Sequence, residues 1–259
     1  MRKIRILSWN VNGLRAVQRK GFFDWLAAEQ PDILCLQETK VEDHNFPQQA
    51  IAAAGYQAVF SGQKTYNGVA VLSRETASEV VCGNPHMACE QKRLIAATVG
   101  GLRVICAYVP NGQSVGSEKY AYKLAWLAAL ETWLAEQLVI HPNLAIAGDF
   151  NIAPEDRDVH NPAAWEGQVL CSEPERAAFR RLLAIGLKDS FRLFAQPEKT
   201  FSWWDYRMLG FQKNQGLRID HILLSKPLAQ RCSAARIDRE MRKRERPSDH
   251  APVIADITD

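Results

Sequence analysis

Short apolar runs that each end in polar side chains recur along this chain of 259 residues. The clearest run, Leu144–Ala147, lies between Pro142 and Pro154, and its shortness and flanking prolines predict a buried strand. Asp149 and Asn151 follow this strand two residues apart, so both side chains point to the same face. A carboxylate beside an amide suits a site that orients a water molecule and holds a phosphate. In isolation, a Gly-Asp-x-Asn sequence also forms an ordinary turn in which the Asp side chain bonds its own backbone.

The order of apolar and amphipathic segments predicts the fold class. Helices are expected at 21–30, 46–54, 117–138 and 174–185, and strands at 5–11, 32–37, 57–61, 68–73, 94–99, 102–109, 144–147, 218–225, 234–237 and 251–257. Gly100-Gly101 predicts a hairpin between its flanking strands, and 161–173 is expected to be irregular. Both halves hold strand pairs and helices, and no linker divides the chain. We therefore expect one α/β (α+β) domain over 1–259, with two mixed sheets packed on each other and helices outside.

The apolar content and the cysteines bear on the location of the protein. Hydrophobic residues make up 47% of the chain, but no apolar run approaches the roughly 20 residues that span a membrane. The N-terminus has no long apolar region of the kind found in signal peptides. The 6 cysteines form no C-x-x-C pair, and Cys35 and Cys106 lie in apolar strands, where thiols behave as small hydrophobic groups. We therefore expect a reduced, cytoplasmic protein with no membrane partner, and nothing suggests anything other than a monomer.

The net charge of +3 decides little, but the cations are clustered near both ends of the sequence. The clusters are Arg2, Lys3, Arg5, Arg15, Arg19 and Lys20, and Arg239, Arg242, Lys243, Arg244 and Arg246. Clustered cations are typical of a protein that binds a polyanion. A solvated face in which Glu240 and Glu245 are interspersed explains the second cluster equally well.

Eight polar residues stand where predicted strands end. They are Asn10, Glu38, Tyr108, Asp149, Asn151, Asp220, Asp249 and His250. Each has a simple structural explanation by itself: Asn10 caps a turn, for example, or Tyr108 is a core ring with a hydrated tip. In a sandwich of two sheets, however, such strand ends gather at one edge, so we expect these side chains to meet.

This set of groups suits the hydrolysis of a phosphodiester. Glu38 offers the hard oxygen that Mg²⁺ prefers, and the metal would neutralise the scissile phosphate. Asp220 would fix the tautomer of His250, and Asp149 would orient the attacking water or accept its proton. The neutral donors to the phosphate oxygens would be Asn10, Asn151 and Tyr108.

The chain resembles the exonuclease III family over nearly its whole length. The motifs that carry the resemblance are Ser8-Trp-Asn-Val-Asn-Gly-Leu-Arg15, Leu36-Gln-Glu-Thr-Lys40, Gly68-Val-Ala, Tyr108-Val-Pro-Asn-Gly112, Gly148-Asp-Phe-Asn151, Gly216-Leu-Arg-Ile-Asp220 and Pro247-Ser-Asp-His-Ala-Pro252. Family members are Mg²⁺-dependent apurinic/apyrimidinic endonucleases of base-excision repair. The resemblance implies a four-layer α/β sandwich and a hydrolase that uses Mg²⁺, with Mn²⁺ as a substitute. Its substrate would be damaged double-stranded DNA, cleaved 5′ to an abasic site or freed of 3′-blocking groups and 3′ nucleotides.

The resemblance also implies roles for individual residues. Glu38 would be the principal metal ligand, with Asn10 and Asp249 close by; Asn12 would be a further metal neighbour, although some members carry Asp there. Asp149 would position the nucleophile, Asn151 and Tyr108 would contact the phosphate, and His250 would pair with Asp220. Trp203, Leu217 and Ile219 would surround an extruded sugar that lacks its base, whereas Trp204 is expected in the core. The further DNA contacts would be Arg15, Arg19, Lys20, Lys40, Lys64, Asn111 and Arg207.

One segment departs from the family pattern. Many members carry Phe-Leu-Pro before a Glu-Arg pair, whereas this chain reads Gly167-Gln-Val-Leu-Cys-Ser-Glu-Pro-Glu-Arg176. The family places this loop beside the damage pocket. A bulky Leu170 there would narrow the room for an abasic sugar and favour the trimming of 3′ phosphates or 3′ nucleotides.

Two other functions are compatible with the same fold. A phosphoinositide phosphatase or sphingomyelinase is one, but the Tyr108–Gly112 and tryptophan-rich segments resemble the DNA-repair branch more closely. A non-catalytic nucleic-acid-binding regulator is the other. Such a relative is expected to lose catalytic carboxylates or the histidine, and all of them are present here.

Overall fold

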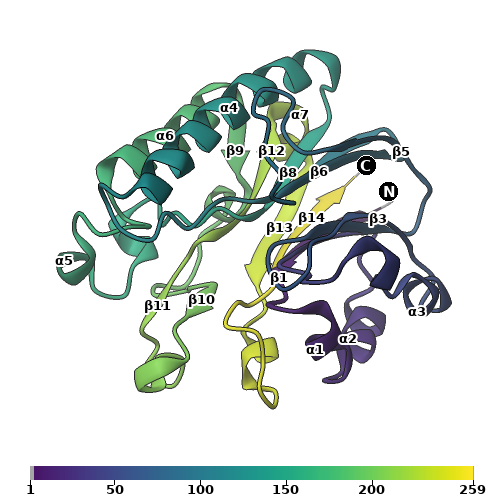
Figure 1. Ribbon diagram of the computed structural model, residues 1–259, viewed down its shortest axis with the longest axis horizontal. Helices are drawn as coiled ribbons and strands as arrows, with labels where there is room; N and C mark the ends of the chain where they lie inside the picture. Colours follow the sequence, from purple (N-terminus) through teal and green to yellow (C-terminus); the bar gives the residue numbers. More distant parts are fainter. Residues whose placement is uncertain (1–2, 259) are drawn as a thin grey trace.

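The computed structural model describes residues 3–258, and most of its strands belong to two six-stranded sheets (Figure 1). The first sheet has the order β13 (Cys232–Ile237), β14 (Val253–Thr258), β1 (Lys3–Asn10), β2 (Ile33–Gln37), β4 (Val69–Ser73) and β3 (Gln57–Ser61). The second has the order β5 (Ala77–Cys82), β6 (Leu94–Val99), β7 (Leu102–Tyr108), β8 (Leu144–Asp149), β12 (Asp220–Ser225) and β9 (Leu187–Asp189). A separate hairpin pairs β10 (Trp203–Trp204) with β11 (Gly216–Leu217).

Helices cover the outer face of each sheet. The first sheet is covered by α1 (Leu14–Gln18), α2 (Phe22–Glu29) and α3 (Gln48–Ala53), and the second by α4 (Glu118–Ile140) and α6 (Glu173–Ala184) (Figure 1). The order helix, sheet, sheet, helix confirms the expected four-layer sandwich. The shorter helices are α5 (Pro162–Trp165) and α7 (Lys226–Arg231), and the 3-10 turns are Asp43–Asn45, Asp156–Asp158, Ser190–Leu193, Arg207–Leu209 and Arg239–Lys243.

Three apolar layers hold the sandwich together. One lies between the two sheets and contains Cys35 and Cys106, both fully buried as expected. The others lie under the two helical layers, where Trp126, Leu130 and Leu134 of α4 contact the second sheet. Burial of such side chains stabilises each by about 1.5–3 kcal/mol relative to exposure. The two sheets are therefore fixed face to face, and their strand ends are held at a common edge.

The sequence pattern locates the strongly apolar elements well. The hairpin at Gly100-Gly101 is confirmed, because β6 and β7 are antiparallel and Val99 pairs with Leu102. The pattern misses β5, since this edge strand is mostly exposed and carries no apolar alternation. It also misses α1, α7 and the short strands β9, β10 and β11, and the strand expected from 218 begins at Asp220. Within the segment expected to be irregular, Asn161 caps α5.

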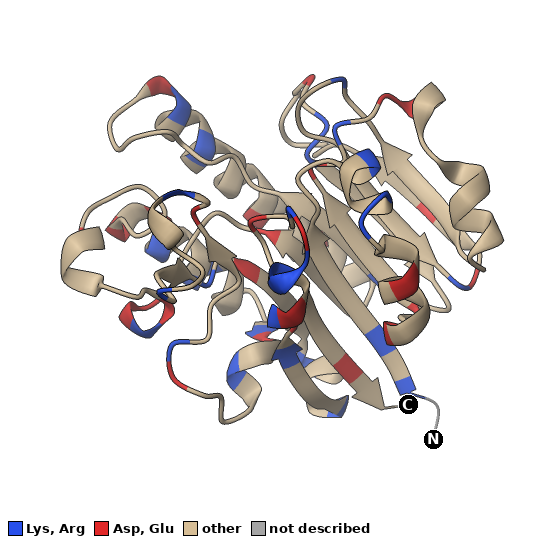
Figure 2. Cartoon of the chain, turned by 90° about the horizontal axis from the view of Figure 1, so that it is seen from below, with Lys and Arg blue, Asp and Glu red and all other residues tan. Residues whose placement is uncertain are grey.

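Two cationic segments that lie far apart in the sequence meet in the structure. Lys20 Nζ donates to the backbone carbonyl of Arg246 (2.5 Å), and Arg244 donates to that of Gly21 (2.8 Å). Figure 2 views the chain from the side on which α1 lies, and Lys and Arg are interspersed there with Asp and Glu. Arg2 lies outside the described residues. None of the helices within residues 3–258 is long and apolar enough to cross a membrane.

Candidate active site

Strand pairing places three of the predicted residues side by side in the second sheet. Asp149 at the end of β8 pairs with Tyr108 at the end of β7 and with Asp220 at the start of β12. Gly148 lets β7 and β8 approach closely, because a Cβ at this position would lie 1.8 Å from the carbonyl oxygen of Ala107. The glycine before Asp149 is therefore required by packing, and it helps to place the carboxylate.

The amide of Asn10 connects the two sheets at this edge. Asn10 is fully buried at the end of β1. Its Nδ2 donates to Glu38 Oε1 (2.9 Å) and to Asp149 Oδ2 (3.0 Å). Glu38 follows β2 of the first sheet and Asp149 ends a strand of the second. One buried amide thus holds carboxylates that come from both sheets.

His250 is fixed by a second carboxylate. Its Nδ1 lies 2.9 Å from Asp220 Oδ2, and its Nε2 lies 3.7 Å from Asp149 Oδ2. Ser202 Oγ donates to Asp220 Oδ2 (2.6 Å) and accepts from the backbone N–H of Asp220 (3.0 Å). The imidazole is therefore oriented by Asp220, which is itself oriented by Ser202.

Burial and neighbouring charges set the protonation of these groups. Burial raises the pKa of Asp149 to about 7; His250 acts against this shift and Asp220 adds to it. Burial alone would lower the pKa of His250, but the charges of Asp220 and Asp149 outweigh it and raise the pKa to about 10. Burial also opposes ionisation of Glu38, yet a hydrogen bond from Asn10 and the charge of Lys40 hold its pKa below the ordinary value. At neutral pH, His250 is a cation and Glu38 a carboxylate, whereas Asp149 exchanges its proton readily.

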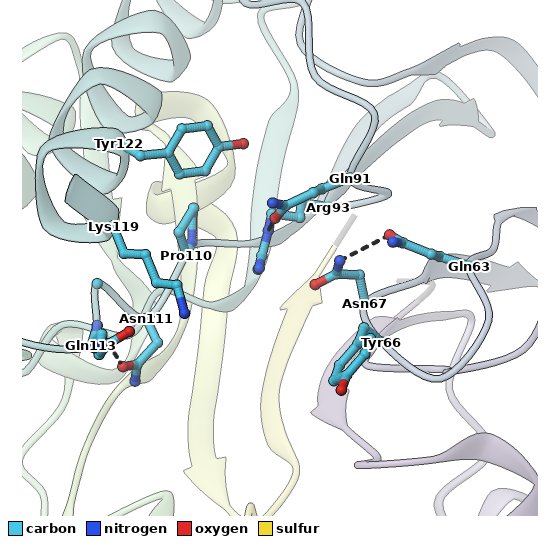
Figure 3. Close-up of a pocket in the computed structure, with 11 residues that line it drawn as sticks. Gln63, Tyr66, Asn67, Gln91, Arg93, Pro110, Asn111, Gln113, Lys119 and Tyr122 are labelled. Atoms are coloured by element: carbon cyan, nitrogen blue, oxygen red, sulfur yellow. Dashed lines mark hydrogen bonds between the residues drawn. The ribbon is translucent and has the colours of Figure 1, made fainter.

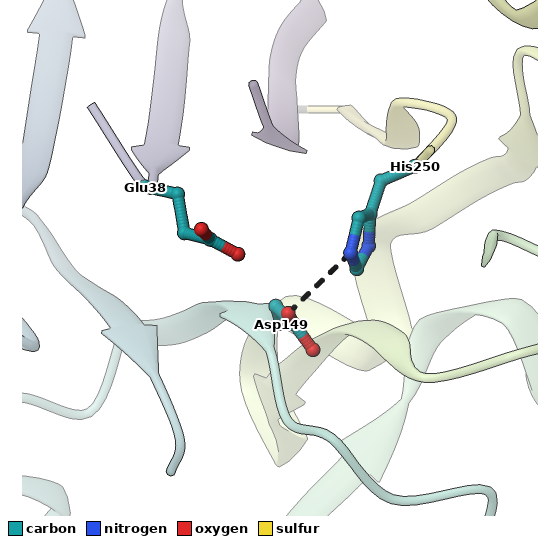
Figure 4. Close-up of side chains that lie close together, drawn as sticks. All are labelled: Glu38, Asp149 and His250. Carbon is teal, nitrogen blue, oxygen red and sulfur yellow. Dashed lines mark ion pairs between the residues drawn. The ribbon is translucent and has the colours of Figure 1, made fainter. Parts of the chain in front are cut away.

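Among the described residues, three side chains at this edge have the spacing of a metal site. Glu38, Asp149 and His250 each offer one atom, and these atoms lie within 4.8 Å of one another (Figure 4). The two carboxylates are hard oxygen ligands of the kind that a divalent cation such as Mg²⁺ takes. His250 is bonded to Asp220 through Nδ1 and has a raised pKa, so it contributes charge to the site rather than a lone pair. The donor set therefore fits a hard divalent metal held by carboxylates.

The other predicted metal neighbours lie beside this group. Asp249 accepts from Asn12 Nδ2 (2.9 Å) and from the indole N–H of Trp203 (3.0 Å), so hydrogen bonds engage both of its oxygens. Asn12 Oδ1 accepts from Lys40 Nζ (2.5 Å), which also contacts Glu38 Oε2 (2.9 Å). The ammonium group of Lys40 thus bridges Glu38 and Asn12.

Several residues at this site have an unusual backbone conformation. Four residues other than glycine adopt left-handed conformations there: Asn12 (φ 47), Glu38 (φ 49), Lys40 (φ 54) and Asn151 (φ 49). Each such conformation costs free energy and persists only where the surrounding structure enforces it, which is typical of functional sites.

Two of the neutral groups predicted to bind phosphate, Asn151 and Tyr108, are neighbours of Asp149 in the chain and in the second sheet. Asn151 Nδ2 donates to the carbonyl of Val109 (2.9 Å), and its Oδ1 accepts from Asn111 Nδ2 (3.1 Å). Burial, together with the charges of Glu38 and Asp149, raises the pKa of Tyr108 well above its ordinary value, so the phenol stays protonated. The guanidinium of Arg93 lies 4.6 Å from the centre of the Tyr108 ring.

A cavity of about 590 Å³ opens beside Asn111. Its lining combines two cations, Arg93 and Lys119, with amide side chains and with the rings of Tyr66 and Tyr122 (Figure 3). Cations, amides and aromatic rings are the groups that contact phosphates and bases of nucleic acids.

The predicted DNA contacts fall into two groups. Arg15, Arg19, Lys64, Asn111 and Arg207 are exposed, and Lys20, Lys40 and Trp203 are partly buried. In contrast, Leu217 and Ile219 are buried, as is Trp204, which the sequence places in the core. Leu170 packs with Leu217 and Ile219 in one apolar cluster, and Trp203 packs against it. The side chain of Leu170 therefore packs among the residues that the family resemblance assigns to the pocket for an extruded sugar.

Comparisons with known proteins agree with this architecture. Residues 7–250 match the model of the endonuclease/exonuclease/phosphatase family. This chain is a member of that family. Exodeoxyribonuclease III of Haemophilus influenzae is 39% identical over 98% of this chain and 100% of its own length. An exodeoxyribonuclease of Bacillus subtilis is 35% identical over 96% of this chain and 98% of its own. These relatives place the chain in the exonuclease III branch of the family, a branch of metal-dependent DNA-repair nucleases.

Two solved structures of family members are similar throughout. The 3′ phosphatase NExo from Neisseria, solved as a variant bound to a product DNA hairpin, has a TM-score of 0.97 and 44% identity, covering 99% of this chain and 100% of that one. An AP endonuclease from Archaeoglobus fulgidus has a TM-score of 0.93 and 38% identity, covering 97% of this chain and 98% of that one. The similar solved structures thus include both a 3′ phosphatase and an AP endonuclease.

Sequence reasoning missed several residues that support the site. Ser202 contacts Asp220, Arg93 lies against Tyr108, and Lys123 binds the backbone of Asn151. Ser202 lies in a tryptophan-rich segment, where a single serine carries no sequence signal of its own. Lys123 offers one usable signal, since it is a cation on the apolar face of a long amphipathic helix.

Proposed function

We propose that this chain is a Mg²⁺-dependent DNA-repair phosphodiesterase that acts chiefly on blocked 3′ ends, releasing 3′ phosphates and 3′ nucleotides, and cleaves weakly at internal abasic sites. The observation that carries the preference for 3′ ends is the burial of Leu170 against Leu217 and Ile219. An abasic sugar that enters the duplex-facing pocket needs this apolar volume. A terminal 3′ phosphate needs only the polar groups around Asp149.

The Leu170 side chain is held in place by its own backbone. Its N–H donates to Glu175 Oε1 (3.0 Å), and its carbonyl accepts from the N–H of Ala153 (2.8 Å). Leu170 also has φ 77, a conformation that residues other than glycine seldom adopt. The loop therefore cannot withdraw without breaking two buried hydrogen bonds, and the side chain acts as a fixed wall.

The site residues supply the chemistry of hydrolysis. When bound at the Glu38 and Asp149 carboxylates, Mg²⁺ would neutralise charge on the scissile phosphate and the leaving oxygen. Asp149 would orient the attacking water and accept its proton. His250 would stay protonated and face the negative charge that develops on the phosphate oxygens. Asn151 and the protonated Tyr108 would donate to the same oxygens.

The duplex would be held by the cations around the crevice. Arg15, Arg19 and Lys20 lie on or just after α1, and Arg207 lies on an exposed loop with Met208 and Leu209. Backbone contacts of this kind position a duplex without reading its sequence. The cavity beside Asn111 would take a neighbouring part of the DNA strand, with Arg93 and Lys119 near its phosphates.

A side-by-side substrate panel tests this proposal. Wild-type protein with Mg²⁺ is given a duplex with one internal abasic site, a nick with a 3′ phosphate, and a recessed 3′ end. We expect phosphate release at the nick to exceed abasic cleavage by at least roughly tenfold, the discrimination that apolar contacts in a pocket supply. Equal or greater cleavage of the abasic duplex would identify the chain as an abasic endonuclease, the activity of the Archaeoglobus relative.

Variants at Leu170 test the cause. In Leu170→Gly we expect abasic cleavage to rise relative to 3′-phosphate release, because the side chain that fills the pocket is removed and the left-handed backbone is relieved. Leu170→Met conserves the side-chain volume and serves as the matched control, with the wild-type ratio expected. An unchanged ratio in Leu170→Gly would show that the loop does not set the preference.

A further inference from the structure

A charged side chain lies buried beneath the catalytic edge. Lys123, in α4, has no exposed surface, and its Nζ donates to the carbonyls of Asn111 (3.0 Å) and Asn151 (2.7 Å) and to Glu175 of α6. An ammonium group has three N–H donors. All three are used here, and two of them bind the backbone of Asn111, a predicted DNA contact, and of Asn151, predicted to contact the phosphate.

Glu175 extends this network to the loop that carries Leu170. Its Oε1 accepts from the N–H of Leu170 (3.0 Å), and its Oε2 accepts from the N–H (3.1 Å) and the hydroxyl (2.5 Å) of Ser172. With Lys123 this makes four donors, which matches the acceptor capacity of a carboxylate. The hydroxyl of Tyr120, also in α4, contacts Ser172 Oγ (2.6 Å).

The helical layer has other contacts besides this ion pair. A large apolar cluster joins α4 and α6 to the second sheet, Arg181 of α6 pairs with Glu131 of α4 (2.8 Å), and Arg103 of β7 donates to Gln137 of α4 (2.9 Å). Buried ion pairs gain little over well-packed apolar side chains, because removing two charges from water offsets most of their attraction. The distinctive feature of this pair is that its hydrogen bonds lead to three separate loops, each at the edge of the site.

We propose that Lys123 and Glu175 form a positioning pair. The pair holds the Asn111 loop, the Asp149–Asn151 turn and the Leu170 loop at fixed distances from one another around the substrate phosphate. Neither side chain reaches the substrate. Lys123 acts through the backbone of Asn111 and Asn151, which sets where their amides point. Glu175 acts through the backbone of Leu170 and Ser172. The same pair therefore links the groups that bind phosphate to the wall that limits the pocket.

The decisive variant replaces both charges. Lys123→Met combined with Glu175→Leu leaves no unpaired buried charge, so the protein is expected to fold, but the three loops lose their tether. We expect kcat on the best substrate of the wild type to fall roughly 10- to 100-fold, the loss that a displacement of about 1 Å produces, with KM changed less than threefold. Amide hydrogen exchange at Leu170 and Ser172 is expected to accelerate. The single variants Lys123→Met and Glu175→Gln are expected to lose at least as much activity.

Leu130→Ala provides the matched control for stability. Leu130 is fully buried in the apolar cluster under α4, and its side chain takes no part in the hydrogen-bond network of Lys123 and Glu175. Assayed below its unfolding temperature, this variant is expected to keep the wild-type kcat and the slow exchange at Leu170 and Ser172. Wild-type kcat and wild-type exchange in the double variant would overturn the proposed positioning role. The role of Leu170 in substrate choice rests on the proposed function. The positioning role is tested by kcat on whichever substrate the wild type prefers, so a wrong assignment of the preferred substrate would appear in the substrate panel and not in this test.

Discussion

His250 Nδ1 lies 2.9 Å from Asp220 Oδ2, and this bond leaves Nε2 facing Asp149. The two carboxylates keep the imidazole protonated, since their charges raise its pKa to about 10 against the effect of burial. In Asp220→Asn one of these charges is removed, and only a neutral amide oxygen remains to accept from the imidazole N–H. We expect the single-turnover rate to fall by roughly 100-fold or more, the range of general acid–base contributions.

The control for this variant is Asp24→Asn, which removes an exposed carboxylate from α2. Its rate is expected to stay within about twofold of wild type, as is typical of surface sites far from the chemistry. A rate for Asp220→Asn that matches this control would show that the Asp220–His250 pair does not take part in turnover.

Arg93 lies against the ring of Tyr108, with 4.6 Å between the guanidinium carbon and the ring centre. The cation holds the ring and supports its phenol as a donor near Glu38 and Asp149. In Arg93→Met the apolar stem remains but the charge is lost. We expect kcat to fall roughly tenfold, which corresponds to a partly desolvated cation–π contact. Lys92→Met removes an adjacent exposed cation and is expected to behave as wild type, so equal kinetics of both variants would contradict this role.

Metal removal tests the carboxylate pair at the edge of the sheets. We expect EDTA to abolish hydrolysis of DNA and added Mg²⁺ to restore it. Glu38→Gln weakens one hard ligand, and the Mg²⁺ concentration for half-maximal rate is expected to rise by at least roughly tenfold. In Glu198→Gln, which alters an exposed side chain, that concentration is expected to stay unchanged. Full activity in EDTA would rule out the metal site.

The strand-end groups were predictable because strands deliver side chains by simple geometry. Asp149, Tyr108 and Asp220 lie side by side, as expected for polar residues at the ends of neighbouring apolar strands. The hydrogen-bond partner of each group could not be predicted from the sequence. The Asn10 amide joins Glu38 to Asp149 because the two sheets pack on each other. The local sequence does not predict how close the ends of strands in different sheets will lie.

Elements and residues outside the apolar pattern could not be predicted in this way. The edge strand β5 is mostly exposed, so it lacks the alternation that marks a half-buried strand. Leu217 and Ile219 are buried in one apolar cluster with Leu170, and this packing of separate segments cannot be read from local sequence. Lys123 appears in sequence only as a cation on an apolar helix face, and its partners come from three separate loops.

His221 follows Asp220 on β12 and is held in the opposite protonation state from His250. Its Nε2 lies 2.9 Å from the carbonyl of Ile152, to which it donates, and its Nδ1 accepts from the guanidinium of Arg218 (3.0 Å). A second proton, on Nδ1, would be repelled by the positive charge of that guanidinium. Burial, reinforced by the charge of Arg218, lowers the pKa of His221 to about 4.

The acid side of the stability profile should therefore depend on His221. Between its ordinary pKa near 6.5 and the folded value of about 4, the unfolded chain binds a proton that the folded state does not. Stability is present above this range and falls as the pH drops through it, by about 3 kcal/mol for this group. In His221→Gln, whose amide can donate to Ile152 and accept from Arg218, urea unfolding at pH 7 and pH 4.5 should show a smaller difference. The exposed His44→Gln variant should keep the wild-type difference, and if both variants keep it, His221 is not the titrating group.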